Sequence, residues 1–260
     1  MFGVNGTQLM GCVPHTVSFI NNSSGASSFF WNFGDGSPIV NTTRNIDTVV
    51  HTYLIPGVFT ATLRGTNGCA DTSASLIITV FQKPLPSFTA DKYLLCIGDT
   101  VRFTNLTDSA TSYLWQFGDG GSSGLTSVNY TYGNYGIYQV RLVANSNKGC
   151  SDTIRKMVEV YPMPKAQILI PDSAMCLLGN QFQFNNASSI PYHTLSYEWR
   201  FGDGAFANTI NSNHKYSAHG WYTVSLIAKS AMNCRDTMQR LIEVYPMPHA
   251  QFRLADTARC

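Results

Sequence analysis

A seven-residue stretch that occurs three times constrains the fold of this chain more than any other feature. The copies are Trp31-Asn-Phe-Gly-Asp-Gly-Ser, Trp115-Gln-Phe-Gly-Asp-Gly-Gly and Trp199-Arg-Phe-Gly-Asp-Gly-Ala, and their tryptophans are 84 residues apart in both intervals. An internal period divides a chain into equivalent structural units, so it takes precedence over the prior that length alone provides. We therefore expect three small domains in tandem.

Each copy is predicted to begin as a β-strand that ends in a tight turn. In the first copy, Phe29, Trp31 and Phe33 alternate with Phe30 and Asn32, which places the first set on a buried face. The Gly-Asp-Gly that follows favours a turn, because glycine allows positive φ and the Asp side chain can bond the nearby backbone. The predicted signature residues are Trp31, Phe33, Asp35, Trp115, Phe117, Asp119, Trp199, Phe201 and Asp203.

The rest of each copy also reads as β-structure. A first strand leads to a cysteine, a Ser-, Thr- and Asn-rich segment with a short edge strand follows the turn, and no stretch has a sustained helical period. Proline-rich joints such as Tyr161-Pro-Met-Pro and Tyr245-Pro-Met-Pro close the copies. We expect domains at 1–82, 83–162 and 163–246, with 247–260 as the start of a fourth, truncated repeat of a longer protein.

These motifs resemble the polycystic-kidney-disease (PKD) repeat. The resemblance rests on aromatic-x-Trp-x-Phe-Gly-Asp-Gly, then His-x-Tyr, then Gly-x-Tyr-x-Val-x-Leu, in the same order in all three copies with local departures such as Tyr130 for His. It implies an all-β fold of tandem immunoglobulin-like β-sandwiches arranged end to end. It also suggests that Tyr138 and Tyr222 form a tyrosine corner, with the hydroxyl reaching upstream backbone.

Composition argues against several classes of function. Charged residues make up 12 % of the chain and the net charge is +2, so neither a basic nucleic-acid patch nor an acidic tail is present. No apolar run reaches the ~20 residues that span a bilayer, and the first residues lack the features of a signal peptide. We expect no nucleic-acid partner and no membrane insertion in this segment.

The seven cysteines, Cys12, Cys69, Cys96, Cys150, Cys176, Cys234 and Cys260, precede either the second or the last strand of a copy. Such a pattern in a surface protein indicates disulfides. Pairing within repeats gives Cys12–Cys69, Cys96–Cys150 and Cys176–Cys234, whereas pairing between neighbours gives Cys12–Cys150 and Cys96–Cys234.

The strand order implied by the resemblance bears on this choice. With seven alternating strands, the two cysteines of one repeat lie at opposite poles, more than ~20 Å apart, whereas bonded cysteines need Cα atoms within ~7 Å. The order favours pairing between neighbours and leaves Cys69, Cys176 and Cys260 for partners elsewhere. Both schemes stay open at this point.

The signature offers little chemistry. Asp35, Asp119 and Asp203 are minority candidates for calcium, but each turn supplies one carboxylate and calcium takes six or more oxygens, so we interpret them as turn-formers. His51 is replaced by Tyr130 in the second copy, which favours packing over acid–base catalysis. No catalytic or phosphate-binding motif is recognised, so we expect no enzyme activity and no cofactor.

A second resemblance concerns modification. Asp followed by Ser or Thr and a small or aliphatic residue is similar to the O-glycosylation motif of Bacteroidota surface proteins. The candidates are Thr48, Ser109, Ser173 and Thr257.

We therefore predict a non-enzymatic extracellular or cell-surface array that acts as a stalk, adhesin shaft or filament. Its partners would be other repeats or subunits of the same protein, with surface glycans or proteins as further partners. The alternative is a set of carbohydrate- or protein-binding accessory modules of a larger secreted enzyme.

Overall fold

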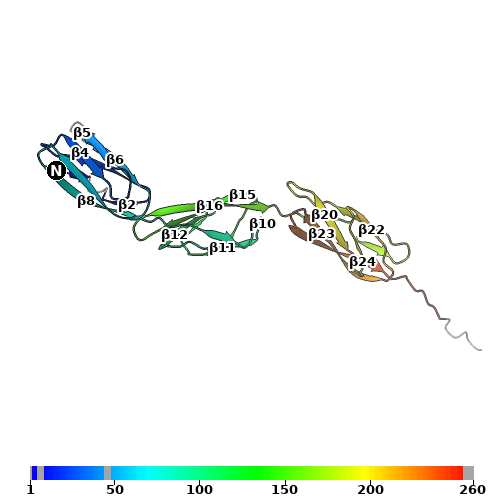
Figure 1. Cartoon of the computed structure of the whole chain (residues 1–260). Coiled ribbons are helices and arrows are strands. Elements are labelled where there is room, and N and C mark those ends of the chain that lie inside the picture. Colours follow the sequence, from blue (N-terminus) through cyan, green and yellow to red (C-terminus); the bar gives the residue numbers. More distant parts are fainter. Residues whose placement is uncertain (1, 5–8, 44–47, 254–260) are drawn as a thin grey trace, which may run out of the picture. The chain divides into compact units, whose positions relative to one another are not determined.

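The structure is a computed structural model that describes residues 2–4, 9–43 and 48–253. The described residues form strands, turns and loops, and the strands fall into three successive groups along the chain (Figure 1). No helix long and apolar enough to cross a membrane occurs among them. The all-β prediction is confirmed. Each group contains two sheets whose strands pair mostly antiparallel, as expected of tandem β-sandwiches.

The first group builds a three-stranded sheet in the order β1-β3-β6 and a five-stranded sheet in the order β2-β8-β7-β4-β5. The strands are β1 (Phe2–Val4), β2 (Met10–Cys12), β3 (His15–Asn21), β4 (Ser28–Asn32), β5 (Val40–Thr43), β6 (Thr48–Tyr53), β7 (Gly57–Thr66) and β8 (Asp71–Phe81).

The second group has the sheet orders β14-β11-β9 and β10-β16-β15-β12-β13. The strands are β9 (Phe88–Ala90), β10 (Leu94–Cys96), β11 (Thr100–Asn105), β12 (Ser112–Gln116), β13 (Ser122–Ser123), β14 (Val128–Thr131), β15 (Gly136–Asn145) and β16 (Ser151–Tyr161).

The third group has the sheet orders β17-β19-β22 and β18-β24-β23-β20-β21. The strands are β17 (Ile168–Leu169), β18 (Ala174–Cys176), β19 (Phe182–Asn186), β20 (Leu195–Arg200), β21 (Phe206–Ala207), β22 (Ser212–His214), β23 (Gly220–Ser230) and β24 (Arg235–Tyr245).

The chain divides into two compact units, and the division passes through the second group of strands. The first unit comprises residues 1–91, 102–130 and 138–157, and the second comprises 92–101, 131–137 and 158–260.

The first strand of each repeat differs from the prediction, because it is split into two pieces that belong to different sheets. In the second repeat, β9 pairs antiparallel with β11, whereas β10 pairs parallel with β16. A repeat therefore has eight strands rather than the seven predicted from the sequence. Asp91 lies between the two pieces and exchanges backbone and side-chain hydrogen bonds with Arg102, which fixes the point where the chain leaves the small sheet.

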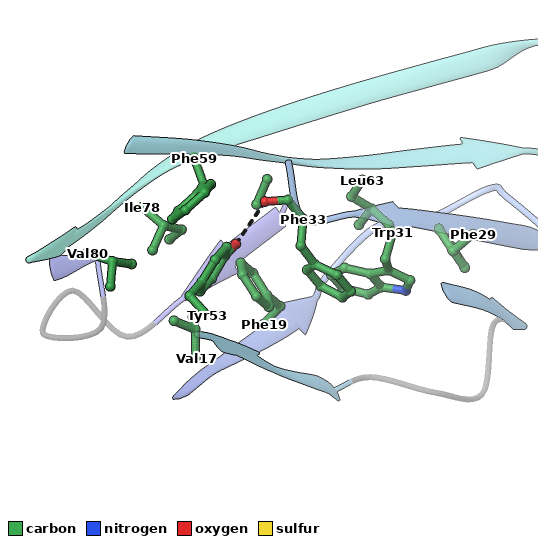
Figure 2. Packing of buried hydrophobic residues seen from close by; sticks show 11 residues of the cluster. Val17, Phe19, Phe29, Trp31, Phe33, Tyr53, Phe59, Leu63, Ile78 and Val80 are labelled. Atoms are coloured by element: carbon green, nitrogen blue, oxygen red, sulfur yellow. Dashed lines mark hydrogen bonds between the residues drawn. The ribbon is translucent and has the colours of Figure 1, made fainter. Parts of the chain in front are cut away.

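The core of each repeat is centred on the tryptophan of the signature. Trp31 of β4 lies in a cluster with Phe19 of β3 and Phe33, and all three are at most 2 % exposed (Figure 2). Trp115 and Trp199 are likewise fully buried. A buried Trp still needs a partner for its N–H. Each indole finds one in the segment that follows the turn: Trp31 donates to Thr42 Oγ1 of β5 at 3.0 Å, and Trp115 and Trp199 donate to the backbone carbonyls of Leu125 and Thr209.

Candidate functional site: the Gly-Asp-Gly turns and the disulfide-bonded joints

The first glycine of each Gly-Asp-Gly turn lies against the backbone of the long central strand. Gly34, Gly118 and Gly202 have φ between +79° and +91°. A Cβ on Gly34 would lie 2.5 Å from the carbonyl oxygen of Thr60, and one on Gly118 would lie 2.9 Å from the nitrogen of Gln139. Glycine is therefore required here both by the positive φ and by the close approach of two backbones.

The aspartate of each turn accepts a hydrogen bond from the backbone two residues later. The nitrogens of Ser37, Gly121 and Ala205 donate to an Oδ1 atom of Asp35, Asp119 and Asp203, at 3.0 to 3.1 Å. This is the local side-chain turn that Asp favours. The three aspartates therefore stabilise their turns, as proposed from the sequence.

Each aspartate also contacts an aromatic side chain from the strand that precedes the long central strand, that is, from β6, β14 or β22. Oδ2 of Asp35 is 2.7 Å from Nε2 of His51, and Asp203 makes the same contact with His214 at 2.7 Å. In the second repeat the hydroxyl of Tyr130 donates to both Asp119 oxygens at 2.9 Å. Tyr130 thus replaces histidine in this contact, because the hydroxyl supplies the same donor.

The same aromatic ring stacks on the Phe of the signature. The ring centroids of Phe33 and His51 are 3.9 Å apart with planes inclined by 3°, and those of Phe117 and Tyr130 are 3.7 Å apart. The third repeat repeats the stack with Phe201. One side chain therefore joins the core to the turn through a ring face and a polar edge.

The tyrosine of His-x-Tyr has a role that sequence reasoning missed. The hydroxyl of Tyr53 donates to the carbonyl of Phe33 at 3.0 Å, drawn as the dashed line in Figure 2, and Tyr216 donates to Phe201 at 2.8 Å. These tyrosines hold the end of the Trp strand. The recurrence of Tyr two residues after His or Tyr in all three copies was the signal that could have identified them. The tyrosine-corner expectation has a counterpart in Tyr222, whose hydroxyl donates to Ala218 O at 2.9 Å.

Burial and these contacts shift the pKa values of the residues at the turns. Burial alone would raise the pKa of Asp35, but hydrogen bonds from Ser37 and His51 outweigh it and leave the pKa below its usual 3.8. The pKa of Asp203 is lowered in the same way by His214 and the backbone. Burial, followed by the hydrogen bond to Asp119, raises the pKa of Tyr130 to about 12.

The minority calcium candidates are thus already engaged as hydrogen-bond acceptors. Within the described residues, no group of three or more His, Cys, Asp or Glu side chains is placed to hold a metal ion. The three aspartates belong to three separate turns.

Among the residues that the structure describes, two disulfides are formed, and both join neighbouring repeats. Cys12 is bonded to Cys150 and Cys96 to Cys234, with Cα–Cα distances of 5.7 and 5.6 Å and a sequence separation of 138 residues in each case. This is the second of the two pairing schemes. Each bond lies within one of the two compact units, and we refer to the two sites as the first and second joints.

In the first joint, the two cysteines come from different kinds of element. Cys12 ends the short strand β2, directly opposite Phe81 at the end of β8 in a parallel ladder. Cys150 ends the turn between β15 and β16, where Ser146 N donates to Cys150 O at 2.8 Å and Cys150 N to Ser146 Oγ at 3.2 Å. The Lys148 ammonium of this turn lies 5.7 Å from the centre of the Phe81 ring, a cation–π contact across the joint.

The second joint repeats this plan. Cys96 ends β10 opposite Tyr161, the last residue of β16, and Cys234 ends a turn closed by the same two hydrogen bonds with Ser230. Here an aromatic cluster adds to the bond. Tyr161 contacts the ring of His193 at 5.8 Å, and Tyr135 contacts Tyr192 at 5.5 Å.

The remaining predicted residues are not brought into these sites. Cys69 and Cys176 are free and exposed. The glycosylation candidates Thr48, Ser109 and Ser173 are exposed, and Ser109 has φ of +63°. Thr257 and Cys260 lie outside the described residues.

Comparison with solved structures finds a single PKD domain and a chain of three domains. The PKD1 domain of the Vibrio cholerae metalloprotease PrtV is 30 % identical and covers 30 % of this chain and 96 % of its own, with a TM-score of 0.27. Three N-terminal domains of the Hoc protein of bacteriophage RB49 are 12 % identical and cover 94 % of this chain and 99 % of their own, with a TM-score of 0.40.

Sequence comparison gives a more specific result. Human Polycystin-1 is 24 % identical over 232 residues, which are 85 % of this chain and 5 % of Polycystin-1, so the chain spans about a twentieth of that relative. The PKD domain profile matches residues 10–80, 82–160 and 162–244. With three matches that together cover most of its length, the chain belongs to the PKD domain family.

Proposed function

We propose that this segment is a non-enzymatic extracellular structural array, in which PKD repeats joined by disulfides act as a stalk, adhesin shaft or filament of a surface protein. The observation that carries the proposal is the repetition of one joint. Two equivalent cysteine pairs connect neighbouring repeats in equivalent ways, so the bonds constrain the array rather than the individual cores. Persistent disulfides fit an oxidising compartment outside the cell.

The connectivity of the disulfides would limit how far the chain can be stretched. Each bond bypasses the residues between its cysteines, and the two bypassed segments overlap. The shortest covalent path from residue 1 to residue 260 therefore runs through residues 1–12, 96–150 and 234–260, about a third of the chain. Fully extended, this path measures roughly 300 Å, compared with roughly 900 Å for the reduced chain.

Single-molecule stretching tests the proposal directly. Pulled by its ends in oxidising buffer, the 260-residue chain should reach a contour length of roughly 300 Å, and a reductant should release it to roughly 900 Å. The variant Cys96→Ser/Cys234→Ser, which retains only the first bond, should give an intermediate length of roughly 400 Å. An oxidised chain that extends as far as the reduced chain would contradict the structural role.

The proposal also covers the type of protein from which this segment comes and its need for metal. The Asp-Ser and Asp-Thr triplets and the cysteine pattern favour a surface protein of the Bacteroidota type, with other repeats or subunits of the same protein as partners. We propose that no metal is needed, since each turn aspartate is occupied by a backbone amide and an aromatic donor. Chelation with EDTA should therefore leave the melting temperature unchanged, and a loss restored by calcium would contradict this part.

A second candidate function is a carbohydrate- or protein-binding accessory module of a secreted enzyme. A shallow hollow on the five-stranded sheet of the third repeat favours it, because Phe206 is 70 % exposed there beside the ion pair of Glu198 and Arg200. Exposed aromatic rings beside polar side chains are a usual surface for ligands. Specific retention on a glycan array, lost on Phe206→Ala, would favour this function.

A further inference from the structure

The Trp strand of the third repeat has a sheet edge that is covered at one end only. β21 is the neighbour of β20 on this side, and it pairs with β20 only at Trp199 and Arg200. The order of the large sheet ends with β23-β20-β21, so no other described strand lies on this side. Residues 195–198 of β20 therefore form an open edge.

The first repeat shows that the same edge accepts a longer strand. There β5 pairs with β4 over four consecutive residues, from Ser28 to Trp31. In the third repeat β21 ends at Ala207, and the chain then passes to β22 in the other sheet. The place that the end of β5 takes beside β4 therefore has no strand beside β20.

The backbone of the open edge can receive such a strand. Phe201 N donates to Ala205 O at 3.1 Å, across the turn that leads to β21. Successive residues of an antiparallel strand direct their N–H and C=O groups to opposite sides, so Tyr197, four residues earlier, directs both groups to the side of β21. No strand pairs with Tyr197 there, and it presents one donor and one acceptor to an added strand.

A hollow of about 450 Å³ lies along the open edge, on the face of the sheet that carries Glu198 and Arg200. These two side chains form an ion pair at 2.6 Å. The other side chains around the hollow are apolar or cationic, and they include Ile210, Ile227, Lys229 and Arg235. The ion pairs among the described residues engage neither Lys229 nor Arg235. The hollow therefore has a surplus of positive charge.

We propose that the open edge binds an extended acidic peptide of a partner protein, which joins the sheet as a strand antiparallel to β20. The backbone hydrogen bonds of the added strand provide affinity, and the cations of the hollow select acidic side chains. The proposal goes beyond the structural role of the array and does not rest on it, because every residue of the site belongs to the third repeat.

The geometry of the sheet fixes which side chains of the peptide meet the cations. Lys229 of β23 stands opposite Ser196 of β20. The added strand and β23 lie on either side of β20, about 10 Å apart. A glutamate of the added strand and Lys229 span this gap together, since the small side chain of Ser196 leaves the space between them open.

The second repeat has the same open edge without the cations. β13 pairs with β12 only at Trp115 and Gln116. Asn145 stands opposite Ser112 there, as Lys229 stands opposite Ser196, and Ser151 begins β16 as Arg235 begins β24. The preference for acidic peptides therefore belongs to the third repeat, and the second repeat serves as its internal control.

The test uses a labelled peptide of alternating glutamate and valine, about eight residues long, with blocked ends. Fluorescence anisotropy with the 260-residue chain should show saturable binding below about 1 mM peptide. The valines stand opposite inward-facing residues such as Tyr197, so their backbone nitrogens make the bonds to β20. Methylation of the valine nitrogens should weaken binding at least about tenfold, whereas methylation of the glutamate nitrogens should not.

Charge reversal on the protein provides the second measurement. Lys229→Glu/Arg235→Glu should weaken binding of the unmethylated peptide about tenfold or more. Lys215→Glu/Arg240→Glu is the matched control, because it makes the same change in net charge at exposed positions of the third repeat outside the hollow. It should change the dissociation constant less than about twofold.

Hydrogen exchange locates the bound peptide. Exchange in residues 195–198 should slow when the peptide binds, while exchange in the equivalent residues 111–114 of the second repeat should stay the same. Three results would each overturn the proposal: no saturable binding, equal binding of the two methylated peptides, or equal effects of the two charge reversals.

A carbohydrate ligand is the remaining outcome of the test. A sulfated glycan that binds through Lys229 and Arg235 while exchange in residues 195–198 stays unchanged would assign the hollow to carbohydrate and overturn the peptide proposal. None of these results alters the contour lengths expected of the oxidised and reduced chain. The proposed structural role is therefore tested separately.

Discussion

At the scale of single residues, the two glycines of each turn share a backbone conformation and differ in their surroundings. Gly118 has φ of +91° and Gly120 has φ of +97°, so any L-residue is strained at either position. A Cβ at Gly118 would meet the backbone of Gln139, whereas a Cβ at Gly120 would meet nothing within 4 Å. The pair therefore separates conformational strain from steric contact.

We predict that Gly120→Ala lowers the free energy of unfolding of the second repeat by about 1–2 kcal/mol, the cost of a left-handed residue. Gly118→Ala should cost roughly 2 kcal/mol more, because backbone atoms cannot withdraw as the end of a flexible side chain can. Chemical denaturation followed by fluorescence of the buried Trp115 measures both. Equal losses would show that the close approach of Gly118 to the backbone of Gln139 adds nothing to the cost of placing a side chain at that position.

The turn aspartate predicts a dependence of stability on acid. Because the pKa of Asp35 is lower in the folded state than its usual 3.8, its contribution is present above that value and is lost as the pH falls through the folded pKa. Asp35→Asn should reduce the stability of the first repeat by about 1–2 kcal/mol at neutral pH. This deficit should shrink below pH ~3.

Hydrogen exchange of peptides from the first repeat, measured for both proteins across the acid range, checks this prediction. Peptides of the second repeat serve as the internal control, since the substitution lies outside that core. A deficit that stays constant down to about pH 2 would mean that the ionised carboxylate is not what the turn requires.

At the scale of elements, the Trp strand organises each sandwich. β12 lies between β15 and the edge strand β13, so Trp115 connects the centre of the five-stranded sheet to its edge. Its ring packs against Phe88 and Phe103 of the small sheet, with centroids 5.1 and 5.7 Å away. The tryptophan therefore holds the two sheets together as well as filling the core.

We predict that Trp115→Ala destabilises the second repeat by ~3–5 kcal/mol, through the cavity it leaves and the loss of the hydrogen bond to Leu125 O. Trp221→Ala is the matched control, because Trp221 is 63 % exposed on β23 and should cost less than about 0.5 kcal/mol. Denaturant unfolding of each variant provides the measurement. Comparable losses at the two positions would refute the assignment of Trp115 to the core centre.

At the scale of the whole molecule, the disulfides connect neighbouring repeats at their ends, with Cys150 and Cys234 buried in the joints. The buried core clusters of the first and third repeats contain aromatic and aliphatic side chains and no cysteine. The bonded cysteines lie at strand ends and turns, next to the segments that join the repeats. Reduction should therefore release the joints while the sandwiches stay folded.

We predict that reduction leaves the fluorescence of the buried tryptophans unchanged and makes the joint segments 82–87 and 162–167 susceptible to proteolysis. The double variant Cys12→Ser/Cys150→Ser, studied without reductant, should expose only the first of these segments. In that variant the second joint keeps its disulfide and serves as the internal control. Mass spectrometry of limited digests identifies the cleavage sites. Cleavage inside the sandwiches on reduction, with loss of the tryptophan signal, would mean that the cores depend on the bonds.

Much of this architecture is determined by local sequence. The alternation around Trp31 predicts which side chains are buried, since strand geometry places alternate residues on opposite faces. The glycines around Asp35 predict a turn, because few other residues adopt positive φ there. These statements depend on a few consecutive residues, and three copies of the pattern make them specific.

The partners of these residues were decided by tertiary structure. Asp35 meets His51 only because β6 packs beside the end of the Trp strand, and nothing in the spacing of 16 residues specifies that contact. The cysteine pairing left open by the sequence depends on the break between β9 and β10. The break moves Cys96 to the edge of the large sheet, opposite the last residue of β16, where the turn of the next repeat reaches it. Disulfide partners depend on which strand ends coincide in space, and that depends on sheet order rather than on sequence separation.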